Sequence, residues 1–163
     1  MCDPSWADPS DTSFSKRAGG RWNPPGEFGA LYLNRTVEVA MANARRHVAS
    51  LFGDDVTLYD LSLGMRPDLQ HYGVREHSFV DAVTKAGLES IGLAGAYPHD
   101  APPGLCRSIA REAYSMEEAG IAARSAPHPA GEELAIFDRA VKQLARKRKR
   151  QRFAQWYGPI SAP

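Results

Sequence analysis

The chain has 163 residues, of which 43% are apolar, and a formal net charge of +1. This length and composition suit one domain, here residues 1–163, with enough apolar side chains to form a core. Because no run of about 18 apolar residues occurs, the sequence excludes a membrane-spanning helix. Residues 1–17 lack the basic start and apolar stretch of a secretion signal, so we expect a cytoplasmic protein.

Taken in chain order, the N-terminal third predicts an irregular leader, a strand and a long helix. Residues 1–28 show no clear periodicity, and residues 30–33 are typical of a short buried strand. Thr36 can cap a helix whose apolar residues recur at helical spacing, and Gly53 ends it. Residues 56–63 alternate between apolar and polar, which predicts a second strand.

The rest of the chain predicts helices and strands without strict alternation. The expected elements are a helix at 77–86, a loop at 92–104, a helix at 105–118, strands at 120–125 and 133–137, and a basic amphipathic helix and tail from about 138. This mixture favours an α+β or mixed α/β fold.

Positive charge is concentrated at the C-terminal end. Residues 138–163 contain eight basic residues and one acid, so the rest of the chain carries a net charge of −6. The run RKRKRQR at residues 146–152 can contact nucleic acid or an acidic partner. Alternatively it is a solvated helix end and tail. Because no aromatic residue interrupts the run, nucleic-acid binding ranks last among the functions considered.

Common catalytic and metal-binding motifs do not occur in the sequence. It has no Walker phosphate loop, no GxGxxG, no HExxH and no GxSxG. Cys2 and Cys106 are too few for a disulfide framework and lack the spacing of a zinc site, so we expect free thiols and no metal. The five histidines are scattered along the chain.

The most informative stretch is GGRWNPPG at residues 19–26. Glycine and proline in this number constrain the path of a loop, which is useful when one side chain must be aimed. Arg21 is that side chain, and its guanidinium offers a fixed fork of donors that suits a phosphate. Trp22 can stack on a base or a nicotinamide ring. The alternative is a structural loop, with Trp22 in the core and Arg21 in solvent.

This stretch resembles the signature of the RES-domain family, the toxins of RES–Xre toxin–antitoxin pairs and their relatives. Residues 19–24 match the family's GGR-W/Y-N-P loop, and Leu31-Tyr32 matches the strand that follows it. Near the other end, Gly120-Ile121 and Ser125 precede an apolar strand that ends at Phe137. The resemblance extends from about residue 5 to residue 138.

The resemblance implies an ADP-ribosyltransferase-like fold, in which small mixed sheets hold NAD+ in a cleft. It implies an enzyme that breaks the bond between nicotinamide and ribose by phosphorolysis, hydrolysis or ADP-ribosyl transfer. NAD+ is then the substrate, inorganic phosphate is a candidate co-substrate, and no metal is needed. An Xre-type antitoxin is the implied partner.

The resemblance also assigns roles to individual residues. Arg21 is implied to bind the pyrophosphate, with Trp22 beside it in the NAD+ site. Tyr32 is implied to pack against nicotinamide or orient the ribose. Ser125 is implied to hydrogen-bond a ribose hydroxyl or the attacking group.

One family residue is missing. The family glutamate is expected eleven residues after Tyr32, where this chain has Asn43, with His47 one helical turn further on. Asparagine can hold a ribose hydroxyl but brings no negative charge, and losing one preorganised electrostatic group typically costs about 10²- to 10³-fold in rate. Three outcomes are open: a slower enzyme, recruitment of another acid such as Glu132 or Glu133, or a binding module without catalysis. The alternative for both acids is a solvated turn.

Overall fold

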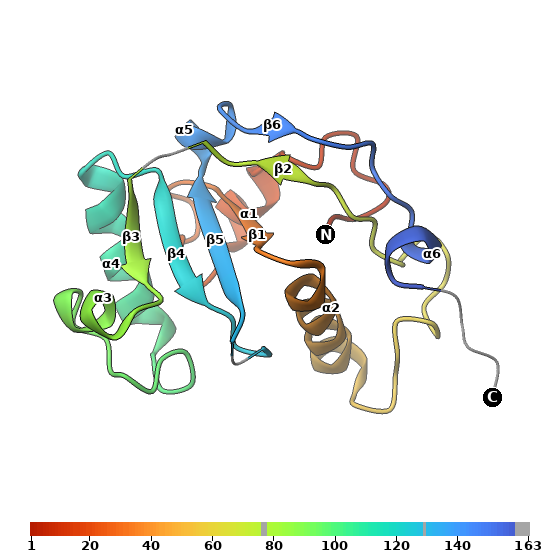
Figure 1. Cartoon of the computed structure of the whole chain (residues 1–163), viewed down its shortest axis with the longest axis horizontal. Coiled ribbons are helices and arrows are strands. Elements are labelled where there is room, and N and C mark those ends of the chain that lie inside the picture. The colour runs from red at the N-terminus through yellow and green to blue at the C-terminus, as the bar shows by residue number, and fades with distance from the viewer. Residues whose placement is uncertain (76–77, 129, 159–163) are drawn as a thin grey trace.

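The centre of this computed structural model is a four-stranded sheet in the order β1-β5-β4-β3, with a two-stranded β2–β6 ribbon beside it (Figure 1). The structure describes residues 1–75, 78–128 and 130–158. The strands are β1 (Ala30–Asn34), β2 (Tyr72–Gly73), β3 (Phe79–Ala82), β4 (Gly120–Arg124), β5 (Glu132–Phe137) and β6 (Ala145–Arg146). The helices are α1 (Ser13–Ala18), α2 (Val37–Phe52), α3 (Lys85–Ser90), α4 (Pro103–Ser115), α5 (Asp138–Val141) and α6 (Phe153–Trp156). Helices around mixed sheets make this an α+β fold, as predicted.

The register of the main sheet decides which side chains share a face. β5 pairs antiparallel with both β1 and β4, whereas β3 and β4 are parallel. Tyr32 lies opposite Ala135, and Asn34 lies opposite Glu133. Because side chains alternate along a strand, Tyr32, Asn34 and Glu133 project from the same face of the sheet.

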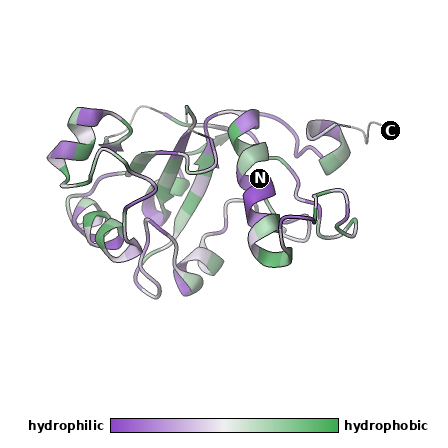
Figure 2. Cartoon of the chain, turned by 90° about the horizontal axis from the view of Figure 1, so that it is seen from below, coloured by the Kyte–Doolittle hydropathy of each residue, from purple (hydrophilic) through white to green (hydrophobic). Residues whose placement is uncertain are grey.

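Two hydrophobic clusters hold the elements together. The first lies between that face of the sheet and helices α3 and α4, and includes Leu88, Cys106, Ala110, Ile121 and Phe137. The second packs α2 against α6 and the segment before β2, and includes Ala40, Ala44, Leu58, Phe153 and Trp156. Figure 2 shows the matching pattern, with apolar colour along the strands and both colours on the surrounding helices.

The long helix and the two C-terminal strands agree with their predicted positions. Thr36 caps α2 by accepting a hydrogen bond from the Val39 amide at 3.3 Å, and Gly53 ends the helix with φ of 96°. α4 begins at Pro103, two residues before the predicted start, because proline suits the first turn of a helix. The loop before it is correspondingly shorter than predicted.

The predicted helix at 77–86 is wrong. Its described residues form β3 and the start of α3 instead. β3 pairs in parallel with β4, so Val80 lies opposite Ile121. Asp81 then accepts hydrogen bonds from the Val83 and Thr84 amides at 2.7 and 3.0 Å, which turns the chain into α3. Tertiary pairing therefore overrides the local helical periodicity.

The predicted strand at 56–63 is also wrong. Thr57 donates to the Asp60 carboxylate from its amide at 2.8 Å and from its hydroxyl at 2.7 Å, which closes a turn. Leu58 is buried in the second cluster from within this turn. Local side-chain hydrogen bonds compete with strand pairing in such sequences.

The C-terminal basic segment is not one amphipathic helix, as predicted, but α5, β6 and α6. Its arginines bond to the N-terminal half of the chain. Arg146 pairs with Asp8, and Arg152 reaches the buried Asp68 at 3.0 Å. Arg150 lies 3.8 Å from the same carboxylate. The leader in turn contains α1 and a bridge from Cys2 to Asp68. These arginines thus hold the C-terminal segment against the N-terminal half of the chain.

Within residues 1–75, 78–128 and 130–158, every helix is too short or too polar to cross a bilayer. The same residues contain no group of three or more His, Cys, Asp or Glu side chains placed to hold a metal ion. Cys2 and Cys106 are buried free thiols. Glu76 and His77, considered as a helix cap, lie outside the described residues.

Candidate functional site

The loop at residues 19–26 needs glycine at its start because other side chains approach its backbone closely. Gly19 has φ of 71°, a conformation that other residues rarely adopt. A Cβ on Gly20 would lie 2.7 Å from Asn23 Oδ1 and would also collide with the Tyr32 hydroxyl. The two glycines therefore allow the loop to close tightly over β1.

Asn23 and Tyr32 form the hydrogen-bonding centre of this loop. The fully buried Asn23 amide donates to the Ser15 carbonyl at 2.7 Å, and its Oδ1 accepts from the Tyr32 hydroxyl at 2.9 Å. That hydroxyl accepts in turn from the Trp22 amide at 2.9 Å. Burial raises the pKa of Tyr32 far above its ordinary range, so the phenol stays protonated. The family tyrosine thus braces the loop.

Arg21 is the half-buried cation that the loop presents. Its Nη1 donates to the Pro98 carbonyl at 2.9 Å, and the guanidinium carbon lies 5.8 Å from the centre of the Tyr97 ring. These contacts orient the guanidinium but use one N–H of the five available, so most of its donors stay available to a ligand.

Trp22 does not lie where a ligand ring can stack on it. It is only 3% exposed and packs in the first hydrophobic cluster, 5.8 Å from the ring of Tyr97. An indole buried to this degree cannot meet a nicotinamide or adenine ring without leaving the core. The structure corrects that expectation and gives Trp22 a packing role.

Four polar side chains meet at one end of the sheet, and we call Asn34, Asn43, Ser125 and Glu133 the polar cluster. Asn43 Nδ2 lies 2.7 Å from Asn34 Oδ1 and 2.8 Å from Glu133 Oε1. Its third contact, to Ser125 Oγ, is longer at 3.4 Å. An amide has two protons, and a carboxylate only accepts, so the nitrogen of Asn43 must face Glu133. The structure thus brings Asn43 and Ser125 together, as the sequence motifs suggested.

The two candidate acids separate onto opposite sides of β5. Glu132 forms an ion pair with the exposed Arg35, away from the polar cluster. Glu133 projects from the other face and contacts Asn43. The solvated-turn interpretation therefore fits neither residue, since both begin β5, but only Glu133 reaches the candidate site. His47 does not join the cluster and lines a separate apolar cavity.

Sequence reasoning missed two residues beside the loop. Arg107 on α4 donates from Nε to the Gly20 carbonyl at 2.9 Å, which brings a second cation to the loop. Tyr97 lies under Arg21 in the loop before α4. A lone arginine in a helix and a tyrosine in a Pro/Gly-rich loop carry no recognisable signal, because only the tertiary contacts bring them to Arg21.

Charged groups of both signs act on Tyr32 and Tyr97. Burial raises the pKa of Tyr97 to about 12, which Arg21 opposes and Glu133 reinforces. At Tyr32, Arg107 opposes and Glu133 reinforces the rise that burial causes. The two tyrosines therefore lie within electrostatic range of both the arginines and the carboxylate. Such an arrangement suits a ligand that carries an anionic part and a cationic part.

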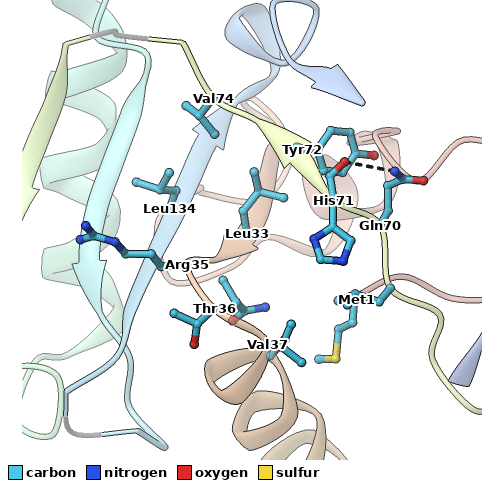
Figure 3. A pocket seen from close by; sticks show the side chains of 13 residues that line it. Met1, Leu33, Arg35, Thr36, Val37, Gln70, His71, Tyr72, Val74 and Leu134 are labelled. Carbon is cyan, nitrogen blue, oxygen red and sulfur yellow. Dashed lines mark hydrogen bonds between the residues drawn. The ribbon is translucent and has the colours of Figure 1, made fainter. Parts of the chain in front are cut away.

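A cavity of about 310 Å³ lies next to the polar cluster and shares Asn34 with it. Figure 3 shows Leu33 and Leu134 from the main sheet on one side and Val74, Tyr72 and His71 on the other. His71 Nε2 lies 2.9 Å from Gln151 Oε1, which ties this wall to the C-terminal segment. The mixed apolar and polar lining makes the cavity a neighbour of the site, reached from the opposite face of β1.

Two comparisons with known proteins gave a match. Residues 2–156 match a family model described as the RES domain. The chain is also similar to the MbcT toxin in a crystal structure of the M. tuberculosis MbcT–MbcA toxin–antitoxin complex, with a TM-score of 0.68 and 22% identity. That alignment covers 93% of this chain and 76% of the other. At such an identity the likeness shows the fold. No match was found among curated proteins.

Proposed function

Because this chain belongs to the RES-domain family, we propose that it cleaves the bond between nicotinamide and ribose in NAD+ and acts as the toxin of a toxin–antitoxin pair. The observation that carries the proposal is the polar cluster, in which Asn43 from α2 contacts Ser125. Asn34 and Glu133 of this cluster share a sheet face with Tyr32, whose hydroxyl holds the backbone next to Arg21. Residues more than 80 positions apart in the chain converge there.

Arg21 and Arg107 suit the pyrophosphate of NAD+. Arg21 keeps several donors for it, and Arg107 adds a second positive charge close by. A charge-assisted contact contributes roughly 1.5 to 3 kcal/mol. Both arginines are held by backbone carbonyls, which reduces the entropy lost when an anion binds.

The polar cluster suits the reacting ribose. In the proposed reaction the bond between ribose C1′ and the nicotinamide nitrogen breaks, and its electron pair neutralises the pyridinium. The positive charge left on C1′ is then taken up by an oxygen nucleophile, which loses a proton when it is water. Water yields ADP-ribose, inorganic phosphate yields ADP-ribose 1″-phosphate, and a protein side chain yields an ADP-ribosylated protein. Among the described residues, Ser125 Oγ has one contact, 3.4 Å from Asn43 Nδ2. Because Ser125 is only 2% exposed, the site must open around it before its hydroxyl can meet a ribose hydroxyl or the attacking oxygen.

Incubation with NAD+, with and without inorganic phosphate, tests the proposal. We expect nicotinamide to appear on chromatography together with one of the products above. Arg21→Ala should slow the reaction about 10- to 100-fold, the loss expected for one charge-assisted contact. NAD+ that stays intact for hours at high protein concentration, in both buffers, contradicts the proposal.

The second candidate function is a nucleotide-binding module without catalysis. The specific observation in its favour is Asn43, which lacks the charge of the family glutamate. Calorimetry separates the two candidates. Heat of binding with NAD+ that remains chemically intact supports the module, whereas release of nicotinamide supports the enzyme.

The toxin role and the antitoxin partner rest on family membership and on the resemblance to a chain of a toxin–antitoxin complex. A further feature in favour of a protein partner is an apolar cavity of about 470 Å³ beside α2, partly lined by the exposed Trp6, Phe14, Leu51 and Phe52. Induced expression should arrest growth, Arg21→Ala should relieve the arrest, and co-expression of an Xre-type antitoxin should restore growth. Normal growth on expression of the unaltered chain contradicts the toxin role.

A further inference from the structure

We propose that Glu133 supplies, from strand β5, the carboxylate that α2 lacks at Asn43, and that it faces the ribose during cleavage of the nicotinamide bond. This inference rests on the proposed function and assigns the negative charge of the same site. It makes Asn43 and Glu133 a transposed pair: the acid has moved from the helix to the strand, and an amide occupies the helix.

The position of Glu133 follows from strand register. It lies opposite Asn34 in the β1–β5 ladder, and Ala135 lies opposite Tyr32 two residues further along. Glu133 therefore shares a sheet face with Tyr32, whose hydroxyl holds the backbone next to Arg21. A shift of one residue in the register would have sent Glu132 to this face instead.

The contacts of Glu133 hold one carboxylate oxygen and leave the other available. Oε1 accepts from Asn43 at 2.8 Å. Oε2 makes no hydrogen bond or ion pair with any residue that the structure describes. The carboxylate is half-buried, so it can meet a ligand in the site while Asn43 fixes its orientation. One fixed and one free oxygen is the arrangement expected of a preorganised electrostatic group.

Asparagine at position 43 is compatible with a carboxylate at position 133, because its amide can donate a hydrogen bond to that carboxylate. Glutamate at both positions would place two like charges within hydrogen-bonding distance and drive one of them to take up a proton. The amide of Asn43 instead donates to Glu133 and to Asn34, so each of these contacts joins a donor to an acceptor. The replacement of the family glutamate by Asn43 is thus consistent with a carboxylate at Glu133.

The chemical role of Glu133 is electrostatic. When the C1′–N bond breaks, its electrons leave with neutral nicotinamide and positive charge develops on the ribose ring. A carboxylate held beside the ring stabilises that charge without forming a bond, and the oxygen nucleophile then attacks C1′. After burial, which is the largest cause, Glu133 is among the groups that raise the pKa of Tyr32 and of Tyr97.

The test compares steady-state NAD+ cleavage by the parent chain, Glu133→Gln and the matched control Glu132→Gln. Glutamine at 133 keeps an oxygen that can accept from Asn43, so it removes the charge and little else. We expect kcat to fall about 10²- to 10³-fold with KM little changed. Glu132→Gln removes a neighbouring surface charge and should stay within about threefold of the parent. Thermal unfolding of each variant reports whether the fold is intact.

The double variant Asn43→Glu/Glu133→Gln returns the acid to the helix and should recover most of the lost kcat. Asn43→Glu alone should not raise activity, because it creates the like-charge pair. An active parent whose Glu133→Gln variant is equally active overturns this inference and leaves the proposed function standing. A parent that leaves NAD+ intact overturns the proposed function and this inference together.

Discussion

The loop at residues 19–26 and the polar cluster satisfy their hydrogen bonds in opposite ways. In the loop, Asn23 and Tyr32 form a closed network in which each polar atom has a protein partner. In the polar cluster, Asn43 shares two protons among three acceptors, and Glu133 keeps one oxygen without a described partner. The loop therefore contributes stability and shape, whereas the cluster keeps its polar atoms for a ligand.

The loop can be recognised in the sequence, whereas the polar cluster, which we propose to contact the reacting ribose, cannot. The GGRWN motif is a contiguous pattern because a tight loop needs particular residues in sequence. The polar cluster draws on β1, α2, β5 and the end of β4, so it has no contiguous pattern. Apart from Arg21, substitutions in the loop should mainly lower stability, and substitutions in the cluster should mainly lower activity.

The largest effect on stability is expected for Gly20→Ala. The added methyl group would collide with the Tyr32 hydroxyl and approach Asn23 Oδ1, which breaks the central hydrogen bonds of the loop. We expect a loss of about 3 kcal/mol of unfolding free energy, seen as a fall of about 6 to 12 °C in Tm for a chain of this size. Activity should fall as well, because Arg21 is displaced.

Gly26→Ala is the matched control in the same loop. A Cβ there meets nothing within 4 Å, and the cost comes only from φ of 84°. About 1 to 2 kcal/mol is expected, with NAD+ cleavage preserved. Equal losses of stability in the two variants, measured by chemical denaturation, would contradict the role given to the Tyr32 contact.

A smaller effect is expected at alkaline pH. The unfolded chain ionises Tyr32 near its ordinary pKa of about 10, whereas the folded chain keeps it protonated well above that pH. The folded state then binds more protons, so unfolding free energy falls as pH rises past 10, by up to about 1.4 kcal/mol per pH unit from this residue. Tyr32→Phe should be less stable at pH 7 but should lose less between pH 10 and 11. If the unfolding free energies of the parent and the variant fell equally between pH 10 and 11, Tyr32 would not be the source of the pH dependence.

The smallest effect on stability is expected for Ser125→Ala in the polar cluster. Ser125 is 2% exposed, but among the described residues its hydroxyl contacts only Asn43, at 3.4 Å, and the Asn43 protons are satisfied by Asn34 and Glu133. The unfolding free energy should change by about 0.5 kcal/mol, while NAD+ cleavage falls about tenfold or more. A marked loss of Tm with unchanged cleavage would reverse the distinction between loop and cluster.

Several elements were predictable because their signals are local. The cap at Thr36, the glycine at 53 and the helical spacing between them suffice for α2, and short apolar runs indicate β1, β4 and β5. The failures share a physical cause. β3 depends on parallel pairing with β4, which lies some 40 residues away. The C-terminal segment depends on partners in the N-terminal half of the chain, such as Asp8 and Asp68.

The same distinction applies to the site. The sequence by itself determined the fold class, the stiff loop and its arginine, since these depend on residue types at neighbouring positions. Only the tertiary structure decided that Trp22 is core, that Arg107 joins Arg21, and that Glu133 rather than Glu132 meets Asn43. Strand register and helix packing decide which distant side chains share a face. Both depend on contacts between segments that lie far apart in the sequence, so no single segment predicts them.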